Sequence, residues 1–391
     1  MRFNLYKIFK QTPVAWLQVT NNPVKLSIAL AGIGFSNLLI FFQLGLMDSI
    51  YNSQRKPIEK LSAELVMVSS GYSNLGSLQE FDRTRLYQAL GVRGVDAVTP
   101  LRIARGTWIT PETRQKFDIF IYGIDLDRQS LDFPELKNNL AAIQPLGTAL
   151  FDRNAKKQYG NVSLALRKNK FMNVEVNNKT LKIIDTFSLG ATFSADANLI
   201  TSDATFQYLF PNQDSRKIQL GLIHIKPGVS AASIQQTIQP LMAHNVRVLT
   251  RGQLAELELS YWKKNSSVGF IFSLGVLVGF VVGSIIVYQI LFGDVMNSLP
   301  QYATLKAMGY KDKYVIGIVI QQSAILAFIG FIPGIILSTG LYALLAGVTK
   351  LTIFMTATRA IQVLTLTFIM CVGSGALATR KLIELDPADV F

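Results

Sequence analysis

The sequence has very few of the residues from which metal centres and disulfide frameworks are built. Its 391 residues include one cysteine and two histidines. Cys371 stands alone, which excludes an intrachain disulfide and a cysteine-based metal site, and its apolar surroundings are typical of a small packing residue. His224 and His244 have no neighbouring cysteine or paired carboxylates, so we expect structural roles for both. Asp125 and Asp127 follow a predicted strand, as in a solvated turn.

The sequence also lacks the motifs of several enzyme classes. The P-loop pattern is absent, so the chain is not expected to hydrolyse a nucleotide by itself. The nucleophile-elbow pattern of hydrolases is absent as well. The triplet Gly373-Ser374-Gly375 lies in an apolar stretch, where small residues serve helix packing. We therefore predict a protein that is not an enzyme and that holds no cofactor and no metal.

Charge is missing from four long stretches of the chain. The first of them is about 33 Å long as a helix, which exceeds the ~30 Å hydrocarbon core of a bilayer. A soluble core helix needs only one apolar face, so these runs predict membrane spans. The third run is long for one span, and we expect Pro333 and Gly334 to break or kink it. The predicted transmembrane helices are 26–47, 265–293, 314–346 and 360–379.

The charges beside these runs predict the orientation of the chain. Only basic charges precede the first run, and basic residues also stand in the connection after the second run and directly after the fourth. The positive-inside rule assigns such short basic flanks, and with them both termini, to the cytoplasm. The net charge of +13 does not predict nucleic acid as a partner, because no basic helix or stacking platform occurs. The predicted cytoplasmic segments are 1–25, 294–313 and 380–391, and the predicted periplasmic segments are 48–264 and 347–359.

The first cytoplasmic segment, 1–25, has an amphipathic character. Apolar and aromatic residues such as Phe3, Tyr6 and Trp16 alternate there with lysines and Gln11. This pattern predicts a helix that lies along the inner membrane surface. An irregular tail with some aromatic residues is the alternative.

The segment 48–264 has the mixed, charged composition of a soluble domain. Strand, helix and strand patterns follow one another within it, which predicts an α+β domain between the first and second spans. Its last helix, 251–264, is expected to continue into the second span as one uninterrupted helix. The other predicted elements are strands at 63–69, 117–124, 219–226 and 246–249, a hairpin at 171–185 that turns at Asn177-Asn178, and helices at 230–243 and from Ser202 or Asp203 onward.

The loop 294–313 has an unusual composition for a short connection. A helix is predicted over 301–308, with Pro300 in its first turn and Gly309 as its C-terminal stop. Leu305 and Met308, with tyrosines nearby, give this helix a small apolar face. Such a face rests on the membrane or docks into a groove of a partner protein. A packed interhelical loop is the alternative.

Several segments make the sequence resemble the DevC family, the permease subunits of cyanobacterial ABC exporters within the wider MacB/FtsX group. The resemblance runs over nearly the whole chain and is carried by 16–53, 281–295, the Tyr-Ala-Thr-Leu-Lys run of 302–310, 330–334 and the closing 386–391. It implies a homodimer in the plasma (inner) membrane, surrounded by membrane lipids. It also implies a separate DevA-like cytoplasmic ATPase, a DevB-like periplasmic membrane-fusion adaptor and a TolC-like outer-membrane channel.

The resemblance further implies that the loop after the second span is the coupling helix that contacts the ATPase. Relatives carry an acidic residue before the Tyr-Ala-Thr-Leu-Lys run, whereas this chain has Gln301, so its ATPase contact or partner choice is expected to differ. The coupling residues implied in this way are Gln301, Tyr302, Thr304, Leu305, Lys306, Met308, Gly309 and Tyr310.

These expectations combine into a hypothesis of mechanotransmission. ATP-driven dimerisation of the ATPase moves the coupling helices, the spans tilt, and the helix containing Glu256, Glu258, Tyr261 and Trp262 changes the spacing of the outer domains, so that a glycolipid or other envelope molecule is expelled. An FtsX-like signalling scaffold, which activates an outer enzyme without transport, is the alternative from another class. A lipoprotein-extracting permease is a further one, and a membrane-anchored enzyme is the least favoured.

Overall fold

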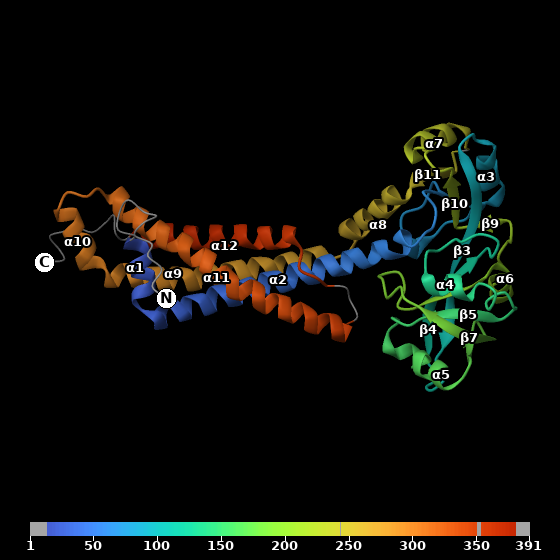
Figure 1. The fold of residues 1–391 in the computed structure, drawn as a ribbon, viewed down its shortest axis with the longest axis horizontal. Coiled ribbons are helices and arrows are strands. Elements are labelled where there is room, and N and C mark those ends of the chain that lie inside the picture. The colour runs from blue at the N-terminus through green and yellow to red at the C-terminus, as the bar shows by residue number, and fades with distance from the viewer. Residues whose placement is uncertain (1–13, 243, 350–352, 381–391) are drawn as a thin grey trace. The chain divides into compact units, whose positions relative to one another are not determined.

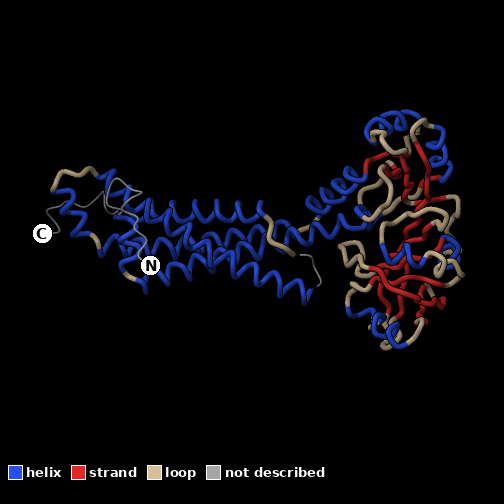
Figure 2. Tube along the Cα trace, viewed as in Figure 1, coloured by secondary structure: helices blue, strands red, loops and turns tan. Residues whose placement is uncertain are grey.

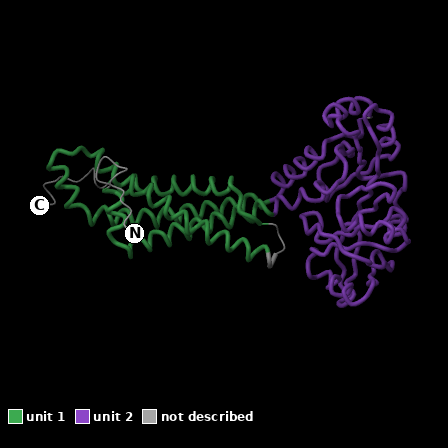
Figure 3. The backbone as a smooth tube through the Cα atoms, in the orientation of Figure 1, with its two compact units in different colours: residues 1–49, 267–391 green, residues 50–266 purple. Residues whose placement is uncertain are grey.

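The computed structural model describes residues 14–242, 244–349 and 353–380. The chain forms two compact units, which consist of residues 1–49 with 267–391 and of residues 50–266 (Figure 3). Within the described residues, the first unit consists of helices and the loops that join them, and the strands lie in the second unit (Figure 2). Phe3, Tyr6 and most of the predicted surface helix lie outside the described residues, as does the tail 381–391.

The described residues include four helices that are long and apolar enough to cross a membrane, and the first of them continues past residue 49 into the second unit. They are α2 (Pro23–Glu59), α9 (Val268–Asn297), α11 (Asp312–Thr349) and α12 (Ala357–Ala378), and they run side by side in Figure 1. Two short helices accompany them, α1 (Val14–Asn21) and α10 (Leu299–Ala307). The predicted fold class, four membrane-length helices with an α+β domain between the first and second, is confirmed.

Small residues allow these helices to approach closely. A Cβ added to Gly283 of α9 would clash with Ser36 Oγ of α2, and one added to Gly375 of α12 would clash with Ser323 Oγ of α11. A side chain at either position would therefore require the facing serine hydroxyl to move. This agrees with the expectation that small residues in such runs serve packing.

Two expectations about helix continuity are wrong. Helix α11 continues through Pro333 and Gly334, so the predicted break does not occur, and the alternative of a kink stays a prediction. Gly34 of α2 lies beside the proline ring, and a Cβ added to Gly34 would be in ordinary van der Waals contact with Pro333 Cγ at 3.4 Å. Prolines are tolerated in membrane-spanning helices because neighbouring groups re-satisfy the backbone groups that the proline frees.

The second wrong expectation is the continuous helix from 251 into the second span. Helix α8 (Arg251–Asn265) ends before Ser266, whose backbone is extended with φ −109° and ψ 143°. The Ser266 hydroxyl and amide both donate to the carbonyl of Trp262, at 2.6 and 3.0 Å. Serine competes well for backbone hydrogen bonds, so it closes α8 here, and α9 begins separately at Val268.

The second unit is built on a nine-stranded sheet. Its strand order is β11-β1-β10-β3-β4-β8-β5-β7-β6, and β3 also pairs with β6. The six strands from β3 to β6 therefore close into a ring, while β11, β1 and β10 extend from the long strand β3. The strands are β1 (Leu65–Ser69), β3 (Val95–Ile109), β4 (Lys116–Ile124), β5 (Thr148–Asp152), β6 (Met172–Val176), β7 (Lys179–Phe187), β8 (Asn198–Ser202), β10 (Leu220–Ile225) and β11 (Val246–Thr250), and β2 (Phe81–Asp82) pairs with β9 (Lys217–Ile218).

Helices cover the faces and ends of this sheet. They are α3 (Arg83–Gln88), α4 (Pro134–Asn139), α5 (Val162–Lys168), α6 (Asp203–Leu209), α7 (Ala231–Ile238) and α8 (Figure 1). The predicted helix 230–243 is shorter than expected, because Pro240 lies in a separate 3-10 turn, Gln239–Leu241. Its last predicted residue lies outside the described residues.

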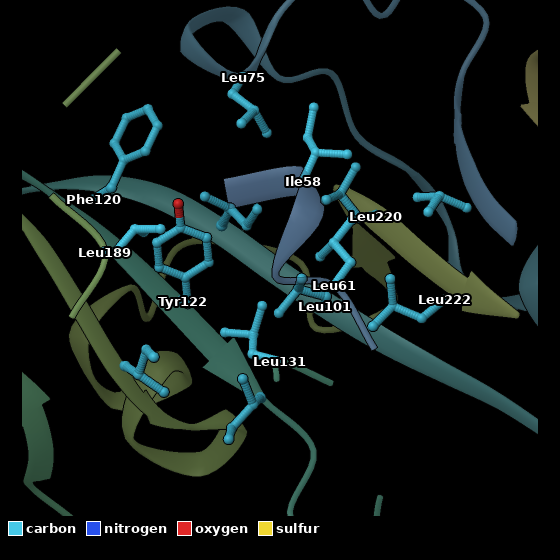
Figure 4. Close-up of a cluster of buried hydrophobic side chains, with 14 of the residues drawn as sticks. Ile58, Leu61, Leu75, Leu101, Phe120, Tyr122, Leu131, Leu189, Leu220 and Leu222 are labelled. Carbon is cyan, nitrogen blue, oxygen red and sulfur yellow. The ribbon is translucent and has the colours of Figure 1, made fainter. Parts of the chain in front are cut away.

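Three buried apolar clusters hold the second unit together. One lies inside the strand ring around Trp108, Ile121 and Phe151. Another lies between β1, β10, β11 and the helices α3 and α7. The third joins the two parts of the sheet and includes Leu75, Phe120 and Tyr122 (Figure 4). The predicted strands and the hairpin are confirmed, and Asn177 and Asn178 both have positive φ, as a two-residue hairpin turn requires.

Candidate functional site

Helix α10 forms where the sequence predicts a helix, with bounds that differ slightly. Pro300 stands in its first turn, where a missing N–H group has no cost. Gly309 ends it with φ +92°, a conformation that favours glycine. The amides of Gly309 and Tyr310 donate to the carbonyls of Lys306 and Leu305, at 2.9 and 3.1 Å. The helix is therefore closed at both ends by its own sequence.

The inner side of α10 is fixed to the helix bundle. Tyr302 is 3% exposed and packs with Val295, Val315 and Val319. Its hydroxyl donates to Gln18 Oε1 at 3.4 Å, and Gln322 Nε2 donates to the same oxygen at 2.7 Å. A single amide oxygen thus connects α1, α10 and α11.

The outer side of α10 exposes Met308 and Tyr310, which are 63% and 47% exposed. Gln301 and Thr304 are exposed as well. The sequence predicts one apolar face, but its residues point in different directions. Tyr302 faces the bundle, and the partly exposed Leu305 packs against the cluster of Val295, Tyr302, Val315 and Val319 (the Tyr302 cluster). Lys306 pairs with Asp312 at 2.9 Å. Met308 and Tyr310, which follow the last residue of α10, are the large exposed apolar side chains at this end of the helix.

Ion pairs fix both ends of the spans. Lys25 of α2 lies 3.2 Å from Asp294 of α9, next to α10. At the other end, Arg359 of α12 lies 2.8 Å from Asp48 of α2, and its guanidinium stands over the Tyr342 ring of α11 at 5.5 Å. Arg359 is 4% exposed. The sequence identified these charges as borders of the runs but did not predict their pairing, because the two members of each pair are far apart in the chain.

Helix α8 is anchored in the second unit by a buried carboxylate. Glu258 is 1% exposed and accepts hydrogen bonds from Tyr72 Oη, the Leu75 amide and Trp262 Nε1, at 2.9, 2.9 and 2.8 Å. Burial raises the pKa of the Glu258 carboxyl, although the three hydrogen bonds act in the opposite direction. The pKa of Tyr72 is also raised, by burial and then by the neighbouring carboxylate.

The other residues predicted for transmission lie nearer the surface of α8. The Glu256 side chain is 65% exposed and reaches Arg55 only at 4.0 Å. Tyr261 meets Trp262 edge-on, with 5.4 Å between the ring centroids. The Trp262 ring packs against the Phe193 ring in a tilted arrangement, with 4.8 Å between the ring centroids. Glu258 and Trp262 are therefore the two of the four that join α8 to the rest of its domain.

The residues for which the sequence predicts structural roles have ordinary surroundings. His224 Nε2 lies 3.2 Å from the Thr99 hydroxyl, and burial lowers the pKa of this imidazole. Asp125 accepts a hydrogen bond from the Asp127 amide at 3.0 Å, as in an Asx turn. Cys371 is buried. No group of three or more histidine, cysteine, aspartate or glutamate residues gathers to hold a metal ion within the described part of the chain.

Comparison with known proteins finds one family model that matches part of the first unit. Residues 270–387 match the family model described as FtsX-like permease C-terminal. No curated protein matches the chain. The periplasmic region of MacB from Actinobacillus actinomycetemcomitans is similar at 13% identity and a TM-score of 0.35, covering 51% of this chain and 94% of that chain. The extracellular domain of the noncanonic ABC-type transporter YknZ from Gram-positive bacteria is similar at 13% identity and a TM-score of 0.34, covering 48% and 99%.

Proposed function

We propose that this chain is the permease subunit of an ATP-driven export system of the DevC type, working in the inner membrane as a homodimer. The cytoplasmic ATPase is a separate chain in this proposal, and a periplasmic adaptor leads to a TolC-like outer-membrane channel. The family match over residues 270–387, which include α10, α11 and α12, supports a permease. The exported molecule is a glycolipid or another envelope molecule.

One observation carries the proposal, namely the two-sided character of α10. On one side of the helix, Tyr302 is buried in the helix bundle and donates a hydrogen bond to Gln18. On the other side, the side chains of Met308 and Tyr310 are exposed. A short helix that is fixed to the spans and open on its other face suits a contact that passes movement from a partner into the bundle. A loop that only connects two spans has no need for exposed apolar side chains.

The orientation follows from the basic flanks. The positive-inside rule places α10 in the cytoplasm, with the ATPase, and the α+β domain in the periplasm. Within the proposal, movement then reaches α8 through the extended residue Ser266, which acts as a joint between two helices. Glu258 and Trp262 carry this movement into the domain.

Cysteine labelling in whole cells checks this orientation. We expect a membrane-impermeant maleimide to label Arg128→Cys, since the Arg128 side chain is 52% exposed in the proposed periplasmic domain. Met308→Cys should react only after the cells are opened. The buried Cys371 supplies the unlabelled background. Labelling of position 308 in intact cells contradicts the proposed topology.

Copurification from native membranes tests the function. We expect the full chain, extracted in mild detergent and crosslinked, to carry an ABC ATPase and a membrane-fusion adaptor, which mass spectrometry identifies. A cell-wall hydrolase in place of the adaptor supports the alternative, an FtsX-like signalling scaffold that transports nothing. The absence of any ATPase contradicts both.

A further inference from the structure

Half of strand β4 has an open edge. Strand β8 pairs with β4 only from Phe120 to Ile124, and within the described residues no strand pairs with 116–119 on that side. The Phe120 amide donates to Ala197 at 3.0 Å, and backbone groups of alternate residues in a strand point the same way. Lys116 and Asp118 therefore direct their backbone groups toward the open side. The Asp118 carbonyl accepts from the Tyr159 hydroxyl, and among the described residues the Asp118 amide and both Lys116 groups have no partner on this side, so they are available to an added strand.

A hollow of about 390 Å³ runs along this open edge. The rings of Phe117, Tyr159 and Phe193 line it, together with Ser194. Ser194 is 4% exposed, and its hydroxyl has no hydrogen-bond partner among the described residues. Charged and polar residues, among them Lys116, Asp118 and Asp196, line the rest of the hollow. A strand edge beside a hollow of mixed polar and aromatic lining matches the way in which extended peptides bind, with main-chain hydrogen bonds for affinity and side-chain pockets for specificity.

Arg105 supplies a charge at the end of this hollow. It also borders a second hollow of about 240 Å³, lined in part by Gly76, Leu78 and Glu80. Its guanidinium stands 4.9 Å from the Phe120 ring centroid, and its ion pair with Asp118 is 3.8 Å long. Within the described residues this guanidinium forms one long ion pair and no hydrogen bond, so its remaining donors suit a carboxylate that accepts two parallel hydrogen bonds.

We propose that the second unit binds a short extended peptide that carries a carboxylate next to an aromatic or aliphatic side chain. The peptide backbone pairs with the β4 edge at 116–119, its carboxylate meets Arg105, and its apolar side chain enters the hollow beside Phe117 and Tyr159. A peptide fits better than a compact small molecule, because the free backbone groups of Lys116 and Asp118 need partners spaced as in a strand.

Residues next to the two hollows contact the helices α8 and α2. The Phe193 ring packs against the Trp262 ring of α8 with 4.8 Å between the centroids, and the Phe193 amide donates to Gln54 Oε1 of α2 at 2.8 Å. On the side of the second hollow, the Leu75 amide donates to Glu258. A peptide that displaces these loops therefore changes the surroundings of Trp262. This part of the inference concerns the second unit only and does not depend on ATPase docking.

Peptide binding to the full chain in detergent tests the proposal. The probes are two fluorescein-labelled, seven-residue β-strand-forming peptides that differ at the central position, which is glutamate in one and glutamine in the other, with a phenylalanine beside it. We expect the glutamate peptide to bind about tenfold more tightly, since a charge-assisted bidentate pair is stronger than a neutral hydrogen bond. Arg105→Gln should remove this preference, whereas Arg167→Gln on the exposed face of α5 should keep it.

Two further measurements separate the parts of the proposal. N-methylation of alternate peptide amides should weaken binding about tenfold if the backbone pairs with β4. An unlabelled glutamate peptide should shift the tryptophan emission of the wild type more than that of Trp262→Phe, in which Trp108, packed on Tyr159, still reports. Equal binding of both peptides to the wild type, or no binding of either, overturns the proposal, as does an unchanged preference in Arg105→Gln. Loss of ATPase copurification without loss of peptide binding would count against the proposed function alone.

Discussion

Met308→Asp is expected to weaken the complex with the ATPase subunit about 100-fold or more. Met308 is 63% exposed, so its replacement leaves the fold of α10 intact. Burying a methionine side chain in an interface stabilises by roughly 1.5–3 kcal/mol, and a buried, unpaired carboxylate adds a cost of its own. The measurement is the amount of ATPase that copurifies with the detergent-extracted variant.

Phe354→Asp is the matched control for this experiment. Phe354 is an exposed apolar residue, 62% exposed, in the connection between α11 and α12, so the same change should leave ATPase binding as in the wild type. Leu305→Asp is a poorer probe of ATPase binding, because Leu305 packs against the Tyr302 cluster. A carboxylate at this position would disrupt the packing of α10 on the helix bundle. Wild-type copurification of Met308→Asp would show that this face of α10 does not bind the ATPase.

Glu258→Ala is expected to lower the free energy of unfolding of the α+β domain by about 3–5 kcal/mol. The change leaves three buried donors without an acceptor, on Tyr72, Leu75 and Trp262. An unsatisfied buried donor costs about 1–3 kcal/mol, and the three share one site, so their costs do not simply add. Thermal unfolding of the full chain and hydrogen exchange at the Leu75 amide measure the effect.

Glu256→Ala is the matched control on the same helix, and its effect on the free energy of unfolding should stay within about 0.5 kcal/mol because this side chain is mostly exposed.

The pH dependence of stability gives a second test of the role of Glu258. Burial raises the folded-state pKa of Glu258 above its unfolded value, so the folded state binds more protons between the two values. The stability that wild type gains over Glu258→Gln is therefore full below the unfolded pKa and falls as the pH rises through the folded pKa. A difference that grows with pH would contradict this assignment.

The parts of the fold that depend on local pattern were predictable. The charge-free runs identify the four spans, and apolar alternation identifies β1, β4, β10 and the hairpin at Asn177-Asn178. Strand β3 was missed because Pro100, Arg102 and Gly106 interrupt its alternation. Strands β5 and β8 were missed because each is a short, fully buried run, which periodicity cannot distinguish from a piece of helix.

The position of helix α10 was predictable from the sequence, but the directions of its side chains were not. Pro300 and Gly309 mark the ends of α10 in the sequence, yet nothing local shows that Tyr302 turns inward while Met308 turns outward. That division depends on Gln18 and Gln322, which belong to other helices. The role of Glu258 as an anchor likewise depends on Tyr72 and Leu75, which are remote in the chain.

By itself, the sequence determined that this protein has four membrane-length helices, a separate α+β domain and a short helix closed by Pro300 and Gly309. These features follow from hydropathy, periodicity and backbone preferences, which act over one or two turns of chain. The tertiary structure alone decided that α11 passes Pro333 without a break, that Arg359 meets Asp48, and that β4 keeps an open edge beside Arg105. Each of these depends on partners brought together by folding, and no local pattern records which distant residues those partners are.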